Sequence, residues 1–377
     1  MELKPAKKLG FGMMRLPVLD ENDSTTIDIE QVKKMVDLFM ERGFTYFDTA
    51  WMYHSFKSEE AVKEALVERH PRDSFTLATK MHSAYFNSVE ERENVFNEQL
   101  RKTGAGYFDY YLLHALSASS FKKHEEFDSF GWLKAKKDAG LVRHIGFSFH
   151  DSAEVLDEIL TAHPEVEFVQ IQLNYLDWNS DSVQSRLCYE TIVRHGKYAV
   201  IMEPVKGGSL ANIPQEAEEM FRNYAPEYSI PSWAIRFAAS LENVMVVLSG
   251  MSSLSQMDDN TSYMQNFVPL SEEENEMCLK AAEIINTQAI IPCTACHYCT
   301  DGCPMNIAIP EYFAIYNDEL RKRKGHRQAK REYVRLNEDH GKASECLQCG
   351  QCEGVCPQHL SIIEYLQTIA EEYEDED

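Results

Sequence analysis

The chain has 377 residues and a formal net charge of −24, with 44% hydrophobic and 26% charged residues. This composition is typical of a globular protein with a sizeable core, and the length fits one barrel of about 250 residues followed by a small second domain. The negative charge argues against nonspecific binding to nucleic acid or to an anionic membrane surface, because phosphate groups would be repelled.

The chain opens with MELKPAKKLG, which lacks the apolar core of a signal peptide. No stretch reaches the roughly 18 consecutive apolar residues that a membrane span needs. We therefore expect a cytoplasmic protein with no membrane partner and no nucleic-acid partner. Because thiols stay reduced in the cytoplasm, clustered cysteines are expected to bind metal instead of forming disulfides.

Between about residues 30 and 270, apolar runs alternate with amphipathic helical stretches, which is the pattern of parallel βαβ units. Seven strands are predicted, and they end near residues 48, 80, 114, 149, 173, 204 and 250. The segment KLGFGMMRL near the start supplies an eighth strand or plugs the bottom of a barrel. No GxGxxG follows the first predicted strand, which argues against an open dinucleotide-binding sheet. The expected fold class is α/β, a TIM (β/α)8 barrel.

After residue 270, the stretch SEEENEMCLKAAEIINTQA predicts a helix that begins at a capping-box serine. We place the domain boundary at the end of this helix. It divides the chain into a barrel over 1–285 and a small, mainly helical second domain over 286–377. The second domain holds two rows of cysteines on either side of a predicted helix, IPEYFAIYNDELRKRKG, and it ends in the acidic EEYEDED.

Both cysteine rows have the spacing C-x2-C-x2-C-x3-C followed by proline. Zinc sites use two close pairs of cysteines and need neither a third at the same interval nor a following Cys-Pro, so iron–sulfur ligation is favoured over zinc. In two-cluster ferredoxins the fourth cysteine of each row ligates the other cluster. The last 90 residues or so resemble the helical two-cluster ferredoxin module. The expected [4Fe–4S] ligand sets are Cys293, Cys296, Cys299 and Cys356 for one cluster, and Cys346, Cys349, Cys352 and Cys303 for the other.

Polar side chains follow three neighbouring predicted strands: Asp48 and Tyr53 after the first, Lys80 at the second and His114 at the third. The carboxyl ends of barrel strands form one face, where active sites are built. A phenol loses its proton near pH 10, and an adjacent cation such as Lys80 lowers that value. Asp48 would hold Lys80 in place. His114 would orient a carbonyl oxygen, and Tyr53 would protonate that oxygen as hydride reaches carbon.

Each of these four residues alone is better explained by a structural role, but in this order they resemble the catalytic tetrad of the aldo-keto reductases. The similarity covers about residues 6–285, and the opening KLGFGMMRLP also looks like the family's first hairpin. The resemblance implies an oxidoreductase that reduces a small-molecule carbonyl, or oxidises the alcohol, with Tyr53 as the general acid. The candidates for lining the substrate pocket are Met14, Trp51, His54, Met81, His82 and His150.

The resemblance also implies a nicotinamide cofactor, because members of the family bind NADPH extended across the barrel mouth. By their positions in the family's motifs, Ser148 and Gln170 would hold the nicotinamide carboxamide, and Asn260 would face the adenine. Met202 stands where an aromatic ring usually stacks under the nicotinamide. The cofactor site therefore departs from the family pattern at its centre.

A second departure concerns the phosphate groups of the cofactor. Gly250 and Gln256 stand where basic residues would meet a 2′-phosphate, and Asp258 and Asp259 would repel it. Lys206, followed by two glycines, offers a phosphate contact. NADPH, NADH, a flavin or another donor at the barrel mouth all stay open.

The two halves of the chain handle electrons differently. A hydride carries two electrons, whereas a [4Fe–4S] cluster passes one at a time and a nicotinamide does not readily stop at a radical. Transfer between the domains would need a flavin or a substrate radical. Otherwise the clusters are structural or serve an outside partner. A ferredoxin or flavodoxin could dock on the basic run RKRKGHRQAKR at 321–331, although this run also fits a solvated helix face.

Two functions follow from these features. The first is carbonyl reduction or alcohol oxidation in the barrel, with two clusters that transfer electrons. The alternative is an electron-transfer or redox-sensing protein whose barrel is a catalytically quiet cofactor-binding module. The intact tetrad favours the first function, and the altered cofactor positions favour the second.

Overall fold

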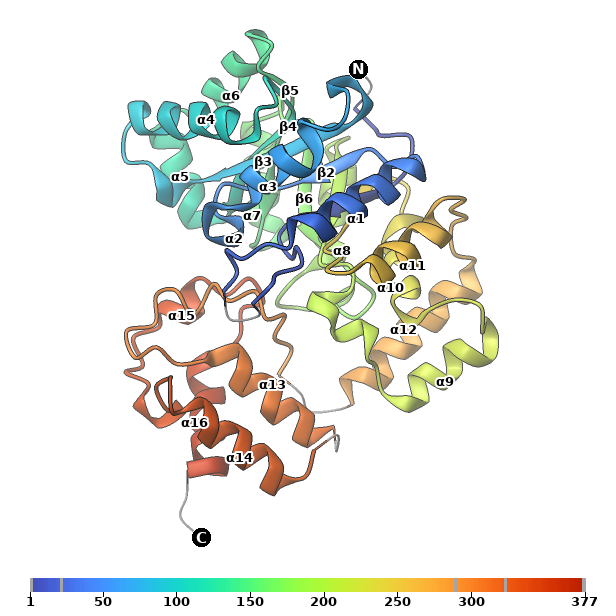
Figure 1. Ribbon diagram of the computed structural model, residues 1–377, viewed down its shortest axis with the longest axis vertical. Coiled ribbons are helices and arrows are strands. Elements are labelled where there is room, and N and C mark those ends of the chain that lie inside the picture. Colours follow the sequence, from blue (N-terminus) through green and yellow to red (C-terminus); the bar gives the residue numbers. More distant parts are fainter. Residues whose placement is uncertain (1–2, 21–22, 288–290, 322–323, 375–377) are drawn as a thin grey trace.

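The computed structural model describes residues 3–20, 23–287, 291–321 and 324–374. Eight parallel strands form one closed barrel in which β8 pairs with β1. Helices surround the barrel, and a smaller helical unit lies beside it (Figure 1). The TIM barrel expected from the sequence is therefore confirmed. None of the helices in these ranges is both long and apolar enough to cross a membrane.

The barrel strands lie close to their predicted places: β1 Leu9–Gly12, β2 Tyr46–Asp48, β3 Thr76–His82, β4 Phe108–Leu116, β5 Val142–Phe149, β6 Phe168–Gln172, β7 Tyr198–Met202 and β8 Val244–Ser249. The opening segment forms β1, in which Gly10 pairs in parallel with Tyr46 and Leu9 pairs with Val247. It is neither a plug nor a hairpin, because it fills the gap between β2 and β8. Gly10 suits this position, since a Cβ there would lie 2.7 Å from the Leu248 side chain.

The helices around the barrel are α1 Ile29–Glu41, α2 Tyr53–Phe56, α3 Ser58–Val62, α4 Val89–Thr103, α5 Ala118–Glu126, α6 Ser129–Asp138, α7 Ala153–Ala162, α8 Ser185–Arg194, α9 Gln215–Tyr224, α10 Ile230–Ser240, α11 Leu254–Met264 and α12 Glu272–Asn286. Ser271 and Glu274 form the predicted capping box of α12. Because α12 ends at Asn286, we keep the division into 1–285 and 286–377 as our proposal.

Large apolar side chains fill the amino-terminal part of the barrel interior. Tyr46, Tyr110, Phe168 and Val246 are fully buried there and form one cluster. Polar residues follow at the carboxyl ends of the strands, where this packing stops. The barrel is thus closed at one end and offers a site at the other, as is usual for this fold.

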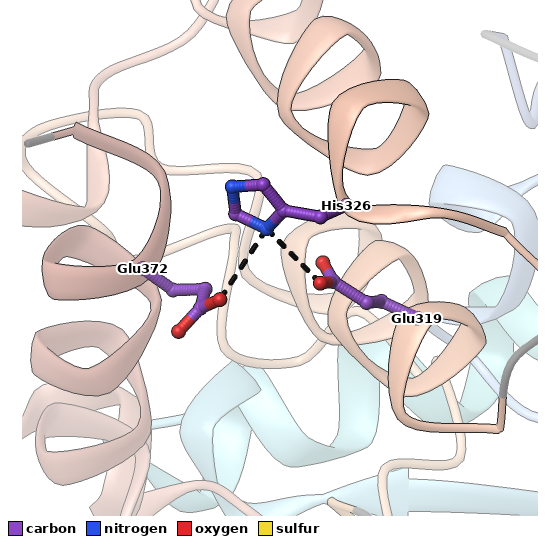
Figure 2. Close-up of side chains that lie close together, drawn as sticks. All are labelled: Glu319, His326 and Glu372. Atoms are coloured by element: carbon purple, nitrogen blue, oxygen red, sulfur yellow. Dashed lines mark hydrogen bonds and ion pairs between the residues drawn. The ribbon is translucent and has the colours of Figure 1, made fainter. Parts of the chain in front are cut away.

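The smaller unit contains α13 Ile309–Leu320, α14 His326–Leu336, α15 Gln351–Gly354 and α16 Ile362–Glu374. Its own apolar core is built around Tyr312, Tyr333 and Leu366. Figure 2 shows His326 of α14 between Glu319 of α13 and Glu372 of α16, with Nδ1 3.0 Å and 3.3 Å from their carboxylate oxygens. These contacts link three helices near the surface, and such surface pairs contribute little to stability.

Specific polar contacts join the smaller unit to the mouth of the barrel. Arg15 Nη2 donates to the Thr294 carbonyl oxygen at 2.7 Å. Lys206 Nζ donates to Gln358 Oε1 at 2.8 Å, and Gln358 Nε2 donates to Glu203 Oε2 at 2.8 Å. The contacts involve the segments that carry Cys293–Cys299 and Cys356, so the first predicted cluster site faces the barrel.

Candidate active site

Three of the four predicted catalytic side chains meet at the carboxyl ends of β2 and β3. Lys80 Nζ donates to Asp48 Oδ1 at 2.5 Å and to the Tyr53 hydroxyl at 3.2 Å. It also donates to the Thr49 carbonyl oxygen at 2.9 Å. Asp48 and Lys80 are 2% and 0% exposed, so water does little to screen their attraction. One ammonium group therefore links the carboxylate to the phenol.

His114 completes the group from β4. Its ring meets the ring of Tyr53 edge to face, with 5.9 Å between centroids. Burial and then the charge of Lys80 hold the pKa of His114 well below its usual range, so the imidazole is neutral. A neutral imidazole has one N–H to donate, and it can hold a carbonyl oxygen without adding a charge to the site.

The electrostatics of Tyr53 correct one expectation. Burial raises the pKa of Tyr53 well above its usual value, and the carboxylates of Asp48 and Glu203 raise it further. The predicted lowering of this pKa by Lys80 is wrong, because the loss of solvent outweighs the neighbouring cation. Burial also lowers the pKa of Lys80 and raises that of Asp48, while each partner opposes the shift. The phenol keeps its proton and is a donor at neutral pH.

Tyr53 is held by a strained segment after β2. Residues 54–56 have positive φ angles between 48° and 71°, which residues with side chains rarely adopt. His54 anchors this segment, since its Nε2 accepts the Leu16 N–H at 3.0 Å and its Nδ1 donates to the Ser24 carbonyl oxygen at 2.7 Å. Such backbone strain is concentrated at functional sites and persists only where neighbours hold it.

A buried polar network lies behind Lys80. Gln99 Nε2 donates to the Lys80 carbonyl oxygen at 3.1 Å and to Glu59 Oε1 at 2.7 Å. The Thr79 hydroxyl donates to the same Glu59 oxygen, and the Tyr111 hydroxyl donates to Gln99 Oε1. Burial raises the pKa of Glu59 to about 7, although both hydrogen bonds oppose this shift. The network can therefore change its charge near neutral pH.

A cavity of about 320 Å³ opens at the tetrad and extends over the ends of β7 and β8 toward α11. Among its lining residues are Asp48, Tyr53 and His114, the pocket candidates Met14 and His150, and the predicted cofactor residues Gln170, Met202, Gly250, Gln256 and Asn260. Trp51, His54, Met81 and His82 do not line it. Gln170 Oε1 is buried without a hydrogen-bond partner in the described residues, so it is an acceptor that an amide N–H of a ligand would satisfy.

Two predicted cofactor residues do not line this cavity. Ser148 Oγ accepts the N–H of Ala115 at 2.7 Å. Lys206 Nζ donates to both carboxylate oxygens of Asp177 at 2.7 Å and to Gln358 at 2.8 Å. The phosphate contact predicted for Lys206 is wrong in this arrangement, because its ammonium is buried in the contact between the two units.

The far end of the cavity also differs from expectation. Asp258 does not line the cavity, and its charge is paired with Arg42. Asp259 does line it and accepts a hydrogen bond from Ser229 at 2.7 Å. Of the two aspartates expected to repel a phosphate, only Asp259 is in position to do so.

Arg15 is a cation in the cavity that sequence reasoning missed. It comes from the segment after β1 and packs over Gly250, where a Cβ would lie 3.4 Å from two of its side-chain carbons. It makes no ion pair with the described residues, and its Nη2 holds the Thr294 carbonyl oxygen. Gly250 and Gln256 cannot supply a positive charge. Arg15, from a distant part of the chain, provides one in the same cavity.

The first predicted set of cluster ligands is brought together. Cys293, Cys296, Cys299 and Cys356 lie close enough to influence one another electrostatically. Burial raises the pKa of Cys293 and of Cys296 to about 11, and neighbouring thiols add to the effect. Thiolates crowded in this way need a cation between them, which fits an iron–sulfur cluster.

The second predicted set is also brought together. Cys303, Cys346, Cys349 and Cys352 line one hollow with apolar residues such as Ile307 and Leu366. Cys349 is exposed, whereas Cys299 of the first set is buried. The two sets therefore differ in their access to solvent.

The first set reaches the barrel cavity. Cys296, Tyr298 and Pro357 line the same cavity as Tyr53 and His114. The smaller unit thus forms part of the wall of the cavity at the predicted tetrad.

Comparison with protein families agrees with both halves of this description. The model of the Aldo/keto reductase family matches residues 8–283. The chain belongs to the aldo/keto reductase family. A 4Fe-4S dicluster domain model matches residues 292–361, which contain both cysteine rows. The protein is therefore an oxidoreductase that carries an iron–sulfur domain, and its family acts on small-molecule carbonyl compounds.

Similar proteins place the barrel among known reductases. An uncharacterized oxidoreductase of Schizosaccharomyces pombe is 23% identical over 268 residues, which are 67% of this chain and 80% of that protein. Among solved structures, the holo form of an aldo-keto reductase from Bacillus halodurans is 22% identical, with a TM-score of 0.59 over 73% of this chain and 91% of that one. An aldo/keto reductase from Klebsiella pneumoniae, in complex with NADP and acetate, is 15% identical, with a TM-score of 0.59 over 76% and 96%. At these identities the solved structures show the fold alone.

In this aldo-keto reductase, sequence reasoning missed Arg15, Glu59, Gln99 and Tyr298. Glu59 lies in KSEEAVKE, which has the pattern of an exposed helix, yet it is 1% exposed. Tyr298 lies between two cluster cysteines and has no sequence feature that links it to the barrel. No local signal could have found these residues, because their roles depend on contacts with distant segments.

Proposed function

We propose that this reductase interconverts a small-molecule carbonyl compound and its alcohol, with Tyr53 as the general acid and base. The observation that carries the proposal is the Lys80 ammonium, which contacts both Asp48 and the Tyr53 hydroxyl at the edge of the cavity. If these three residues had separate structural roles, their charged and polar groups would not be expected to contact one another at the edge of a cavity. The arrangement fits a proton donor backed by a fixed positive charge.

Each residue has one task in the reduction. Tyr53 gives its hydroxyl proton to the carbonyl oxygen as that oxygen gains negative charge. Lys80 stabilises the phenolate that this transfer leaves, which a buried phenol could not otherwise tolerate. Asp48 keeps Lys80 charged, and His114 donates an N–H to the same carbonyl oxygen. In the oxidation the proton returns from the alcohol to Tyr53.

A nicotinamide cofactor in the cavity would supply the hydride. Gln170 would hold its carboxamide through the free Oε1, with Ser148 in support beside the cavity. Met202, Gly250, Gln256 and Asn260 would line its length. Arg15 is the candidate residue for binding the phosphate groups of the cofactor. Both NADPH and NADH are therefore candidate cofactors. A flavin stays as the alternative cofactor, because it would also couple to one-electron donors.

We propose two [4Fe–4S] clusters with the ligand sets given above, and electron transfer as their role. The first set faces the cavity through Cys296. The second set has Cys349 and, near it, Leu347 at the surface, where Leu347 is 63% exposed. A ferredoxin or flavodoxin would therefore approach the second ligand set, and clusters held by the two sets would supply one-electron transfer.

The basic run at 321–331 supports such docking less than the sequence suggested. Lys324 pairs with Asp318 and Glu332, while Arg327 and Arg331 are exposed. Lys322 and Arg323 lie outside the described residues. If the run docks a partner, changing both exposed arginines to Gln should weaken binding of an acidic ferredoxin at low salt. If the variant binds the acidic ferredoxin as tightly as the wild type does, and the binding is still sensitive to salt, the run at 321–331 is not the docking site.

The test of the catalytic proposal is Tyr53→Phe in anaerobically purified protein. Loss of the proton donor should reduce carbonyl turnover about 10²- to 10⁴-fold and leave the iron content and visible absorbance unchanged. Tyr224→Phe, at a 43% exposed tyrosine on α9, is the matched control. Full activity in Tyr53→Phe would end the proposal.

The second candidate is an electron-transfer or redox-sensing protein with a quiet barrel. The withdrawal of Ser148 and Lys206 from the cavity favours it. Titration with NADPH, NADH and FMN, with binding and cluster reduction followed separately, distinguishes the two functions. Cofactor binding without turnover of any carbonyl compound would support the second.

A further inference from the structure

The segment between Cys293 and Cys299 is built into the mouth of the barrel. Thr294 is 2% exposed, and its carbonyl oxygen accepts the hydrogen bond from Arg15. Gly207 has a φ of 63°, and a Cβ at that position would collide with the Thr294 backbone. Only glycine allows this approach, so the contact between the two units is specific and close.

The backbone of this segment turns Tyr298 toward the tetrad. Ala295 and His297 have φ angles of 49° and 63°, which is a costly conformation for residues with a side chain. Tyr298 lines the cavity together with Tyr53 and His114. Tyr298 and Tyr53 therefore face the same space, although they come from different units of the chain.

Apolar side chains and a neutral histidine line this end of the cavity beside two acidic residues, while the cation of the cavity, Arg15, is held by the Thr294 carbonyl oxygen and acts on Glu203. Met14 and Met202 line this end, and so does His150, whose pKa is lowered to about 4 by burial. Its acidic residues, Asp48 and Glu203, lie close to Tyr53. A negatively charged substrate group would meet these carboxylates, whereas a flat apolar group would meet the ring of Tyr298 and the methionine side chains.

We propose that Tyr298, a residue of the iron–sulfur domain, is a substrate-contact residue of the barrel, and that the pocket it closes takes an uncharged aromatic aldehyde or ketone. The inference rests on the proposed carbonyl chemistry and adds the substrate class and the contact that selects it. The iron–sulfur domain then determines specificity as well as carrying the clusters.

The experiment compares benzaldehyde, cyclohexanecarbaldehyde and phenylglyoxylate as substrates of the full-length protein with its clusters. NADPH, NADH or reduced methyl viologen serves as the donor. The wild type should have its highest kcat/KM with benzaldehyde. Cyclohexanecarbaldehyde lacks the flat aromatic ring, and phenylglyoxylate carries a negative charge. Tyr298→Ala should raise the KM for benzaldehyde about 10-fold and change that for cyclohexanecarbaldehyde much less. Tyr298→Phe should stay within about 2-fold of the wild type.

Two controls separate substrate contact from damage to the cluster. The variant His297→Asn replaces the residue next to Tyr298 with asparagine, which tolerates a positive φ angle. It should leave the KM of every substrate unchanged. Iron content and the EPR spectrum of each variant report on the clusters. If Tyr298→Ala loses iron, Tyr298→Leu keeps apolar bulk and is compared in its place. An unchanged ratio of the two aldehyde KM values in a variant with intact clusters would overturn the inference.

Binding of benzamide, an unreactive aromatic amide, is measured by calorimetry in parallel. If the wild type turns over no carbonyl compound but binds benzamide about 10-fold more tightly than Tyr298→Ala does, the proposed function fails and the Tyr298 contact stands. If benzamide binds neither protein and no aldehyde reacts, both are overturned. A preference for phenylglyoxylate over benzaldehyde would remove the assigned substrate class.

Discussion

Changing Lys80 to Met tests whether the buried ion pair is as important as its geometry indicates. The substitution keeps most of the apolar side chain and removes the ammonium, so Asp48 Oδ1 loses its cation and the Tyr53 hydroxyl loses its donor. Asp48 is 2% exposed, and its Oδ2 has no partner in the described residues. Removing one member of a buried pair costs about 3–5 kcal/mol, because the other charge is left without compensation.

The double variant Asp48→Asn with Lys80→Met isolates that cause. It removes the stranded charge, so it should be about 2 kcal/mol more stable than Lys80→Met alone. Stability is measured by urea unfolding of the anaerobic protein, followed by circular dichroism of the barrel. Lys134→Met, at a lysine whose side chain is 62% exposed, is the control and should change stability by less than about 1 kcal/mol.

The effect of pH gives an independent check. Without Lys80 the pKa of Asp48 in the folded state rises further above its unfolded value. Such a group contributes stability below its unfolded pKa and loses that contribution as pH rises through its folded pKa. The deficit of Lys80→Met relative to the wild type should therefore shrink as pH falls. A variant as stable as the wild type, or a deficit that Asp48→Asn does not relieve, would refute the reasoning.

Two further predictions concern residues outside the tetrad. Arg15→Gln should raise the KM for the nicotinamide cofactor about 10-fold in steady-state kinetics, because a charged contact to phosphate is lost. A cofactor KM equal to that of the wild type would remove Arg15 from the phosphate site. Glu59 has a folded pKa of about 7, raised by burial from 4.5, so the stability it contributes is lost as pH rises between these values. Glu59→Gln should flatten that part of the stability profile in urea titrations at several pH values, and a profile of unchanged slope would contradict the assignment.

The sequence predicted most of the barrel because its signals are local. Each strand is a short apolar run, and each helix has its own apolar face, so their alternation is visible without knowledge of their partners. The opening segment was ambiguous for the opposite reason. Its four strand residues, Leu9–Gly12, are defined by pairing with β2 and β8, which lie far apart in the chain.

The candidate tetrad could be proposed from order alone, since parallel strands place their carboxyl ends on one face. The protonation state of Tyr53 could not be predicted from the order of residues. The sequence places a lysine near the phenol, but the direction of the pKa shift depends on how completely the surrounding residues exclude water. Lys206 shows the same limit, because its ammonium is taken by Asp177 and Gln358, partners that no spacing indicates.

The sequence by itself determined the class of fold, the order of the chemical groups along the barrel strands and the two rows of cysteines, all of which depend on regular spacing over short distances. The tertiary structure alone decided that Arg15 lies over Gly250 and that Tyr298 lines the same cavity as Tyr53. The physical reason is that contact and desolvation depend on distances in space. These distances are set when separate segments pack together, and the spacing of residues along the chain does not record them.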